Sequence, residues 1–267
     1  MLMKNHFKTL VTLVACMSVV PAFAQMMGGP RGGMGMGGPP ALDFGGSMGK
    51  LFGNNPDFTA DIEMQMPGRS GGETMTVPGK IAVADGKSRF EMDMANMKGG
   101  NMPAEAASQM KAMGMDQMVT ISLPKEKTTY MVYPGLQAYA PVTMRNPEAA
   151  KPESDFKIET TELGKDTVDG HPCAKNKAVV TDDQGNKHES TIWNATDLHN
   201  FPVKIETQEQ GRTMTMLFKD VKLTKPDASL FEPPSGYKKY DSQMALMQDT
   251  MMKQMGRGGM MMRPPQQ

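Results

Sequence analysis

The strongest constraint on the fold is a two-residue alternation of apolar and polar side chains. Over residues 58–66, which read FTADIEMQM, every second side chain is apolar. Successive side chains of a β-strand point to opposite faces, so this period predicts a strand with one buried face. Similar patterns predict further strands over residues 88–94, 118–123, 128–133, 156–163, 174–181, 187–193, 201–208 and 212–223. In the last of these the apolar phase shifts between Phe218 and Val221, which predicts a β-bulge.

Short turns separate most of these strands. Asp85-Gly86, residues 182–185 and Gln210-Gly211 each contain a glycine, which accepts the positive φ angle of a tight turn. Strands that follow one another through short turns usually pair as antiparallel neighbours. We therefore expect a meandering, mainly antiparallel sheet.

Two segments have a helical pattern. Residues 102–118 place Met110 and Met113 near one helix face, and residues 241–255 carry methionines at helical spacing. About nine strands with one apolar face need a helix to cover that face. We therefore predict a mainly β fold of the α+β class, in which a curved antiparallel sheet forms an unclosed β-barrel wrapped around a helix.

The first 24 residues have the pattern of a secretory signal peptide. Lys4 and Lys8 precede an apolar stretch over residues 9–20, and residues 22–24 read Ala-Phe-Ala, a typical cleavage sequence. The stretch is shorter than the roughly 20 apolar residues that span a bilayer. We expect cleavage after Ala24 and a periplasmic or secreted protein. The alternative is a lipoprotein with peripheral membrane association, because the residues ending at Cys16 resemble a lipobox.

Glycine-rich segments flank the predicted strands. Residues 25–54 form a Gly/Met-rich arm and residues 256–267 a similar tail, and neither has an apolar period. Such segments bury too little surface to offset their ordering entropy, so both are predicted to be disordered. Between them we expect a β-domain over residues 55–240 and an amphipathic, methionine-rich helix over residues 241–255.

Charge and cysteine content exclude some functions. Removal of the signal peptide leaves 27 basic and 29 acidic residues, a formal charge of −2. This near balance argues against a nucleic-acid partner. Cys173 is then the remaining cysteine, so no internal disulfide can form and the fold must rest on its hydrophobic core.

No motif of a common enzyme class stands in its usual structural context in the sequence. There is no His-Glu-x-x-His zinc motif and no phosphate-binding glycine loop before a helix. The Gly-x-Ser-x-Gly pattern occurs at 45–49 and 68–72, but in glycine-rich sequence and not at the strand-to-helix turn that a nucleophile elbow needs. The histidines beyond the signal peptide lie in or beside predicted turns and strand ends, where such side chains are usually solvated: His171, His188 and His199. We expect a non-enzymatic protein without a cofactor.

A set of short features over residues 160–240 resembles a known kind of protein. These features are Val168-Asp169-Gly170 followed by Cys173, Trp193 at the end of one strand, FPVK at 201–204, and SLFEPPSGY at 229–237. They resemble a poorly characterised family of exported bacterial proteins, often rich in methionine and akin to the periplasmic carriers of outer-membrane lipoproteins. The resemblance is vaguer over residues 57–140. It implies an unclosed β-barrel, curled around a helix, with an apolar cavity.

An apolar ligand inside the barrel is therefore the function that we expect. The ligand would be a lipid, an acyl chain or an apolar peptide segment, and an envelope protein could be a further partner. Flexible methionine side chains suit a cavity that adapts to varied ligands. The alternative is that the inward side chains pack on one another and leave no cavity. The candidate cavity residues are Phe58, Ile62, Met64, Phe90, Met92, Met110, Met113, Val119, Ile121, Met131, Ile205, Met214, Met216 and Phe218.

Binding of Cu(I) or Ag(I) is the main alternative function. Thioether sulfurs favour soft ions, and methionines cluster towards both ends of the chain. Neither arm contains a histidine or cysteine to anchor a metal, so the apolar ligand is favoured. A further alternative is a sink in which exposed methionines react with oxidants, or a cell-envelope interaction module. The candidate metal ligands are Met34, Met36, Met244, Met247, Met252 and Met255.

Overall fold

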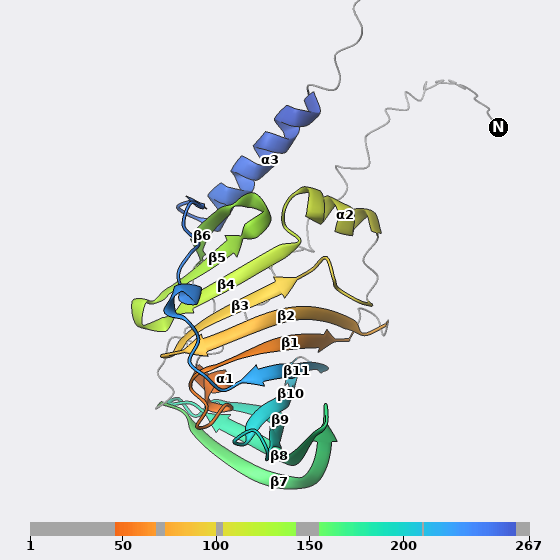
Figure 1. The fold of residues 1–267 in the computed structure, drawn as a ribbon, viewed down its shortest axis with the longest axis vertical. Helices are drawn as coiled ribbons and strands as arrows, with labels where there is room; N and C mark the ends of the chain where they lie inside the picture. The colour runs from red at the N-terminus through yellow and green to blue at the C-terminus, as the bar shows by residue number, and fades with distance from the viewer. Residues whose placement is uncertain (1–45, 68–72, 100–103, 143–154, 210, 260–267) are drawn as a thin grey trace, which may run out of the picture. The chain divides into compact units, whose positions relative to one another are not determined.

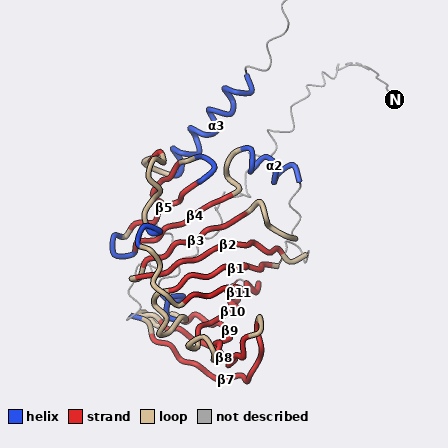
Figure 2. Tube along the Cα trace, in the orientation of Figure 1, coloured by secondary structure: helices blue, strands red, loops and turns tan. Residues whose placement is uncertain are grey.

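The computed structural model describes residues 46–67, 73–99, 104–142, 155–209 and 211–259 of the 267-residue chain. Within these ranges strands predominate (Figure 2). The strands are β1 (Phe58–Met66), β2 (Met75–Ala84), β3 (Lys87–Asp93), β4 (Gln117–Leu123), β5 (Thr128–Tyr133), β6 (Ala138–Val142), β7 (Lys157–Val168), β8 (His171–Thr181), β9 (Lys187–Ala195), β10 (Phe201–Glu209), β11 (Arg212–Lys222) and β12 (Lys238–Lys239). The α-helices are α1 (Gly46–Lys50), α2 (Ala104–Ala112) and α3 (Gln243–Gly259). The predicted signal peptide lies outside the described residues.

The strands form one sheet that is open at both ends. Its order is β12-β6-β5-β4-β3-β2-β1-β11-β10-β9-β8-β7. Two antiparallel meanders, β1 to β6 and β7 to β11, meet where β1 pairs with β11 (Figure 1). The two-residue strand β12 adds in parallel to β6. Over the ranges described above, β7 and β12 lie at opposite ends of this order and do not pair with each other. The prediction of a mainly β, antiparallel and unclosed sheet is confirmed.

Besides the two-residue β12, the sheet includes two strands that the alternation does not predict, β2 and β6. β2 has Pro78 and Gly79 at its centre, and β6 is a five-residue strand that contains Pro141. The pairing of β2 with β1 includes Pro78, which lies opposite Glu63. The pairing of β2 with β3 begins one residue later, at Gly79. Strand propensity depends strongly on neighbours, so pairing on both sides holds β2 in place despite these residues.

The predicted β-bulge lies in β11 and is confirmed. Thr59 of β1 pairs with Lys222, and Asp61 pairs with Lys219, so a two-residue step in β1 faces a three-residue step in β11. Asp220, inside that step, has a φ angle of 49°. The extra residue explains the change of apolar phase after Phe218, and it bends the sheet at the junction of the two meanders.

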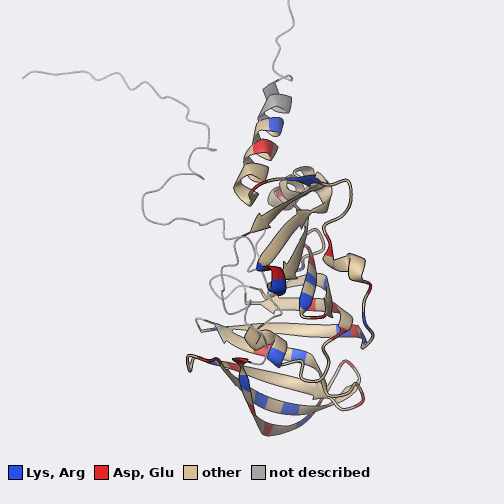
Figure 3. Ribbon diagram, turned by 90° about the vertical axis from the view of Figure 1, so that its left-hand side faces the viewer, with Lys and Arg blue, Asp and Glu red and all other residues tan. Residues whose placement is uncertain are grey.

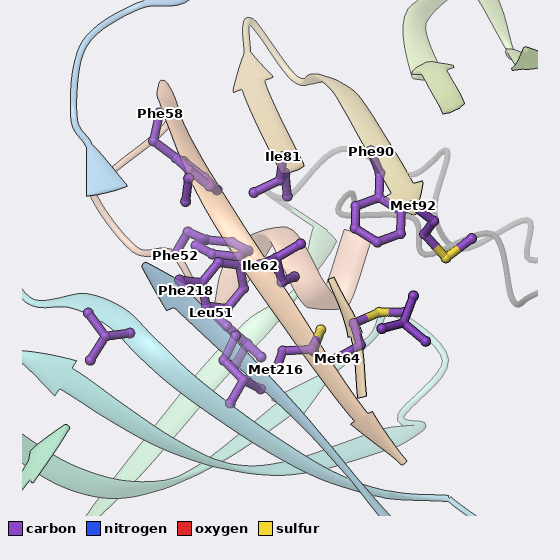
Figure 4. Packing of buried hydrophobic residues seen from close by; sticks show 14 of the residues in the cluster. Leu51, Phe52, Phe58, Ile62, Met64, Ile81, Phe90, Met92, Met216 and Phe218 are labelled. Carbon is purple, nitrogen blue, oxygen red and sulfur yellow. The ribbon is translucent and has the colours of Figure 1, made fainter. Parts of the chain in front are cut away.

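The larger apolar cluster lies on the face that we call the inner face of the sheet. It contains buried side chains from each strand between β1 and β6 and from β8 to β11, so both meanders turn apolar residues towards it. Leu51 and Phe52, which follow α1, pack against this face beside Ile62 and Phe218 (Figure 4). Leu246 of α3 joins the same cluster and is fully buried.

The structure therefore corrects the predicted arm over residues 25–54. Residues 46–50 form α1, and Leu51 and Phe52 are buried. Burial of a leucine and a phenylalanine offsets the entropy of ordering this short segment. The glycine-rich composition of the arm hides this single apolar pair, and the arm before residue 46 lies outside the described residues.

A second apolar cluster covers the opposite, outer face at β2, β4 and β5. It contains Val119 and Ile121 of β4, together with Phe231 from the segment 223–237, which we call the C-terminal strap. Arg89 Nη1 on β3 also donates a hydrogen bond to the Leu230 carbonyl of the strap, at 3.2 Å. The assignment of Val119 and Ile121 to an inner cavity is therefore wrong. Residues 118–123 are all buried, so their sequence pattern does not show which face is inside.

The strap provides a test of this assignment. We expect Phe231→Ala to lower the free energy of unfolding by about 3–5 kcal/mol, because it leaves a cavity over the outer face. Leu230→Ala is the matched control: its side chain is exposed, and its effect should stay within about 1 kcal/mol. Chemical denaturation of both variants measures the difference. Equal effects would contradict the packing of the strap on β4.

Candidate ligand-binding site

The inner face is ordered in rows that run across the strands. One row pairs Ser88 of β3 with Ser122 of β4, and Ser122 with Thr129 of β5. The adjacent row runs from Phe90 through Thr120 to Met131. A third row places Met92 opposite Met118. Along this part of the sheet the inner face therefore changes from hydroxyl side chains at one end to methionine side chains at the other.

Most of the predicted cavity residues meet on this face. Nine of them belong to the large cluster and are buried, and Met214 packs against it while partly exposed. The nine are Phe58, Ile62, Met64, Phe90, Met92, Met131, Ile205, Met216 and Phe218. The structure thus brings together residues from both meanders that are far apart in the sequence.

Met110 and Met113 do not reach the inner face. Met110 lies on α2, which has no buried residue, and Met113 follows this helix. Neither methionine belongs to the large cluster or to the partly buried side chains packed against it. Their assignment to the cavity is therefore wrong. The helical pattern of the segment is real, but α2 does not cover the sheet with a buried face.

The centre of the inner face is filled by the protein itself. Phe58, Ile205 and Met216 have no accessible surface, so no water-sized void adjoins them. The filling side chain is Phe52, whose ring centroid lies 4.8 Å from that of Phe58 and 5.5 Å from that of Phe201. We call residues 46–52 the plug. A ligand at this position would have to replace the plug.

Partly buried methionines surround the packed centre. Seven of them pack against the large cluster: Met48, Met66, Met75, Met94, Met97, Met214 and Met247. Met66 pairs directly with Met75 at one end of the β1–β2 pair, and Met64 pairs with Met216 on β11. Unbranched thioether side chains have low rotamer barriers and fill irregular spaces, so this border can repack around objects of different shape.

The outer face has a shallow, charged groove. It has a volume of about 430 Å³ and crosses β11, β1, β2, β3 and β4. Two ion pairs lie in it: Arg89 is 2.7 Å from Glu91, and Lys219 is 2.9 Å from Glu63. Acidic and basic residues are interspersed along the strands (Figure 3). Paired surface charges of this kind are ordinary for an exposed sheet face and indicate no single-sign partner.

Cys173 and His171 do not form a nucleophilic site. Cys173 is buried and its Sγ donates to the His171 carbonyl oxygen at 3.3 Å, while His171 Nδ1 lies 2.8 Å from Asp197 Oδ2. Burial raises the pKa of the Cys173 thiol, which keeps it protonated and unreactive at neutral pH. No group of three or more His, Cys, Asp or Glu side chains that could hold a metal occurs in the part of the chain that the structure describes.

Trp193, one of the features that carried the family resemblance, has a structural role. Its Nε1 donates to Asp166 Oδ2 at 2.9 Å, and this hydrogen bond is the main cause of the lowered pKa of Asp166. Lys204 Nζ lies 4.1 Å from the centroid of the Trp193 ring. These contacts tie β7, β9 and β10 together and leave the indole buried.

The methionines proposed as soft-metal ligands are only partly described. Met34 and Met36 lie outside the described residues, as does the side chain of Met255. On α3, Met244 and Met252 are exposed, whereas Met247 packs against the core. The Met244 and Met247 side chains thus face different surroundings, although they are three residues apart. No helix in the described ranges is long and apolar enough to cross a membrane.

Polar contacts fix the start of α3 to the sheet. Gln243 Nε2 donates to Tyr133 Oη at 2.8 Å, and the Tyr240 hydroxyl donates to Asp249. Asp249 also lies 3.3 Å from Lys238 Nζ and 3.0 Å from Lys253 Nζ. The hydrogen bond from Tyr240 is the largest cause of the lowered pKa of Asp249, and together these partners bring that pKa to about 2.

Comparison with known proteins identifies a family. Residues 78–201 and 181–237 match the family model described as "Domain of unknown function (DUF4412)". Together these ranges cover more than half of the chain. No curated protein matches the sequence.

Several solved structures are similar to this chain at low identity. A LolA superfamily protein from Nitrosomonas europaea has 8% identity and a TM-score of 0.40, covering 70% of this chain and 94% of its own. A putative outer membrane lipoprotein-sorting protein domain from Vibrio parahaemolyticus has 11% identity and a TM-score of 0.34, with 69% and 92% covered. Lipoprotein LppX from Mycobacterium tuberculosis has 8% identity and a TM-score of 0.35, with 61% and 85% covered.

The anchor of α3 predicts a pH dependence. The folded pKa of Asp249 is depressed from 3.8 to about 2, so its contribution to α3 docking is complete above pH 3.8 and is lost as the pH falls through about 2. NMR titration of the Asp249 carboxyl should give a midpoint near 2. Asp249→Asn should loosen α3 already at neutral pH, seen as faster amide exchange in the helix. A midpoint at or above 3.8 would contradict this anchor.

Proposed function

We propose that this chain, which belongs to the DUF4412 family, is a non-enzymatic exported protein that holds an apolar ligand against the inner face of its sheet. The observation that carries this proposal is the plug. The inner face is a broad apolar surface whose centre is occupied by Leu51 and Phe52, and Leu246 of α3 is buried in the same cluster. An apolar ligand can take the place of these two side chains.

The plug is suited to replacement because it is a short segment that is not part of the sheet. α1 has five residues, well below the length at which a helix is stable by itself. Its attachment rests on the burial of Leu51 and Phe52, worth about 1.5–3 kcal/mol for each side chain. Burial of one methylene group contributes about 0.8 kcal/mol. An alkyl chain of roughly four to eight buried methylenes therefore matches the plug, and a longer chain displaces it.

The surroundings of the plug favour a ligand of variable shape. Seven partly buried methionines border the packed centre and can change rotamer at low cost. The inner face also joins side chains from both meanders, so a chain-like ligand can contact β3 and β5 as well as β10 and β11. A lipid or acyl chain fits this extended surface better than a small rigid ligand.

The chemistry of the remaining polar groups supports a role without catalysis. The Cys173 thiol is buried with a raised pKa, and two ion pairs, Arg89–Glu91 and Lys219–Glu63, lie in the outer groove. Export through the predicted signal peptide, with cleavage after Ala24, would deliver the protein to the periplasm or outside the cell. Lipidation at Cys16 would instead attach it to a membrane. In either case an envelope protein that donates or receives the ligand is the partner that we propose.

Native mass spectrometry of the protein purified from its export compartment tests the proposal. The expected result is a heterogeneous, lipid-sized adduct that disappears on organic extraction. A mass that corresponds to copper, removed by a Cu(I) chelator, would instead support the soft-metal alternative. A bare chain that also fails to take up lipid in vitro would overturn the proposed function.

Substitution of the plug gives a sharper prediction. Phe52→Ala should increase the affinity for a neutral fluorescent probe such as N-phenyl-1-naphthylamine by about tenfold, because the probe no longer competes with the phenyl ring. The same substitution should lower the free energy of unfolding by about 3–5 kcal/mol.

The matched control for this variant is Phe218→Ala. Phe218 packs edge-on against Phe52 at 5.6 Å but belongs to the sheet, so its loss should destabilise the fold by a similar amount without increasing probe affinity. Probe titration and chemical denaturation of both variants provide the comparison. Equal changes in affinity would show that general loosening, and not release of the plug, admits the probe.

A further inference from the structure

The hydroxyl row on the inner face has an unusual composition for a buried surface. Ser88, Ser122 and Thr129 pair directly across three neighbouring strands, and they are 6%, 1% and 4% exposed. Directly opposite residues on adjacent strands have Cβ atoms about 4.5–5.5 Å apart. The flanking pairs are apolar, since Ser88 also pairs with Val83 and Thr129 with Val142. Three hydroxyl groups thus form a compact polar strip within an apolar face.

One member of this row has no hydrogen-bond partner. The Oγ1 atom of Thr129 is buried and makes no hydrogen bond. A buried hydroxyl without a partner destabilises a fold by about 1–3 kcal/mol, and such groups are rare in native proteins. The row therefore holds one hydroxyl that is free to bond to a polar group of a ligand.

The hydroxyl row lies next to the apolar rows of the same face. Two residues along each strand, a rise of about 6.5 Å, lead from the hydroxyl row to Phe90, Thr120 and Met131. A further two residues along β3 and β4 lead to Met92 and Met118. A ligand with a polar head at the hydroxyl row would place its chain along this path towards the methionines.

The surroundings of the row favour an uncharged head. The buried polar side chains of the described chain are Asn, Ser, Thr and one Asp, and they include no Lys or Arg. The buried Asp182 lies in the β8–β9 turn, where its carboxylate accepts hydrogen bonds from the Gln184 and Asn186 backbone. An ionised carboxylate or phosphate on the ligand would be buried without a counter-ion, which is costly. Hydroxyl donors are instead suited to a neutral carbonyl oxygen.

We propose that the row of Ser88, Ser122 and Thr129 binds the uncharged ester head of an acyl ligand, whose chain lies along the apolar rows of the inner face. This inference rests on the proposed function and assigns a class to its ligand. Thr129 donates its free hydroxyl hydrogen to the ester carbonyl, so ligand binding satisfies the group that the ligand-free protein leaves unpaired. Binding thereby gains specificity for acyl esters over plain hydrocarbons.

A near-isosteric substitution separates this role from a structural one. Thr129→Val replaces the unpaired hydroxyl by a methyl group of similar size. We expect the delipidated full-length variant to have a higher Tm than the wild type and a roughly tenfold lower affinity for monolauroylglycerol. Its affinity for dodecane should not change. Thr129→Ser retains the hydroxyl and should keep the preference for the ester.

Thr207→Val is the matched control. Thr207 Oγ1 is also buried and unpaired, but it lies on β10 between Ser190 and Met214, away from the hydroxyl row. Its loss should raise Tm without changing the affinity for either ligand. Displacement of N-phenyl-1-naphthylamine measures all affinities, and a thermal scan gives Tm.

Four results would overturn the inference, and they differ in which part of the proposal they leave intact. If dodecane and monolauroylglycerol bind the wild type equally, or if Thr129→Val keeps the ester preference, the head site is wrong while the apolar site stands. If ionised laurate binds as tightly as the ester, the uncharged head is wrong. If neither dodecane nor the ester displaces the probe from the wild type, the proposed function itself fails.

Discussion

The pairing of β1 with β11 holds the two halves of the sheet together. It joins strands that are about 150 residues apart in sequence, and it is where two meanders become one sheet. Contacts of such long sequence separation must offset a large loop-closure entropy. Ile62 opposite Phe218 and Met64 opposite Met216 contribute the apolar burial that does so. Without this pair the inner face would be two separate half-surfaces.

The bulge within the same pair has a second consequence. The extra residue in β11 near Asp220 bends the strand at the junction of the meanders. Curvature turns the apolar residues of both halves towards a common interior, as the single large cluster shows. The sheet is left open, so its interior is covered by the plug and by Leu246 of α3 instead of by a closing strand. An interior covered by a short segment can open at much lower cost than one sealed by a hydrogen-bonded strand.

The site could be predicted in part, for reasons that differ between strands. Phe90 and Met92 alternate with Arg89 and Glu91, so the charged residues mark the outer face and the buried phase follows. In β4 the C-terminal strap buries the outer face as well, and Val119 and Ile121 then look like inner residues although they pack on Phe231. Phe52 was missed because it stands in a glycine-rich segment without any period. The signal that could have found it is an isolated apolar pair, Leu51-Phe52, directly before a Gly-Asn turn.

Local sequence patterns predict most of the strands, the antiparallel order within each meander and the position of the bulge, because side-chain alternation and turn residues act over a few neighbouring residues. Long-range packing sets the pairing of β1 with β11, the burial of the outer face of β4 by the strap, and the filling of the inner face by the plug. It also brings Ser88, Ser122 and Thr129 into one row, since register across three strands depends on pairing between segments that carry no local code for one another.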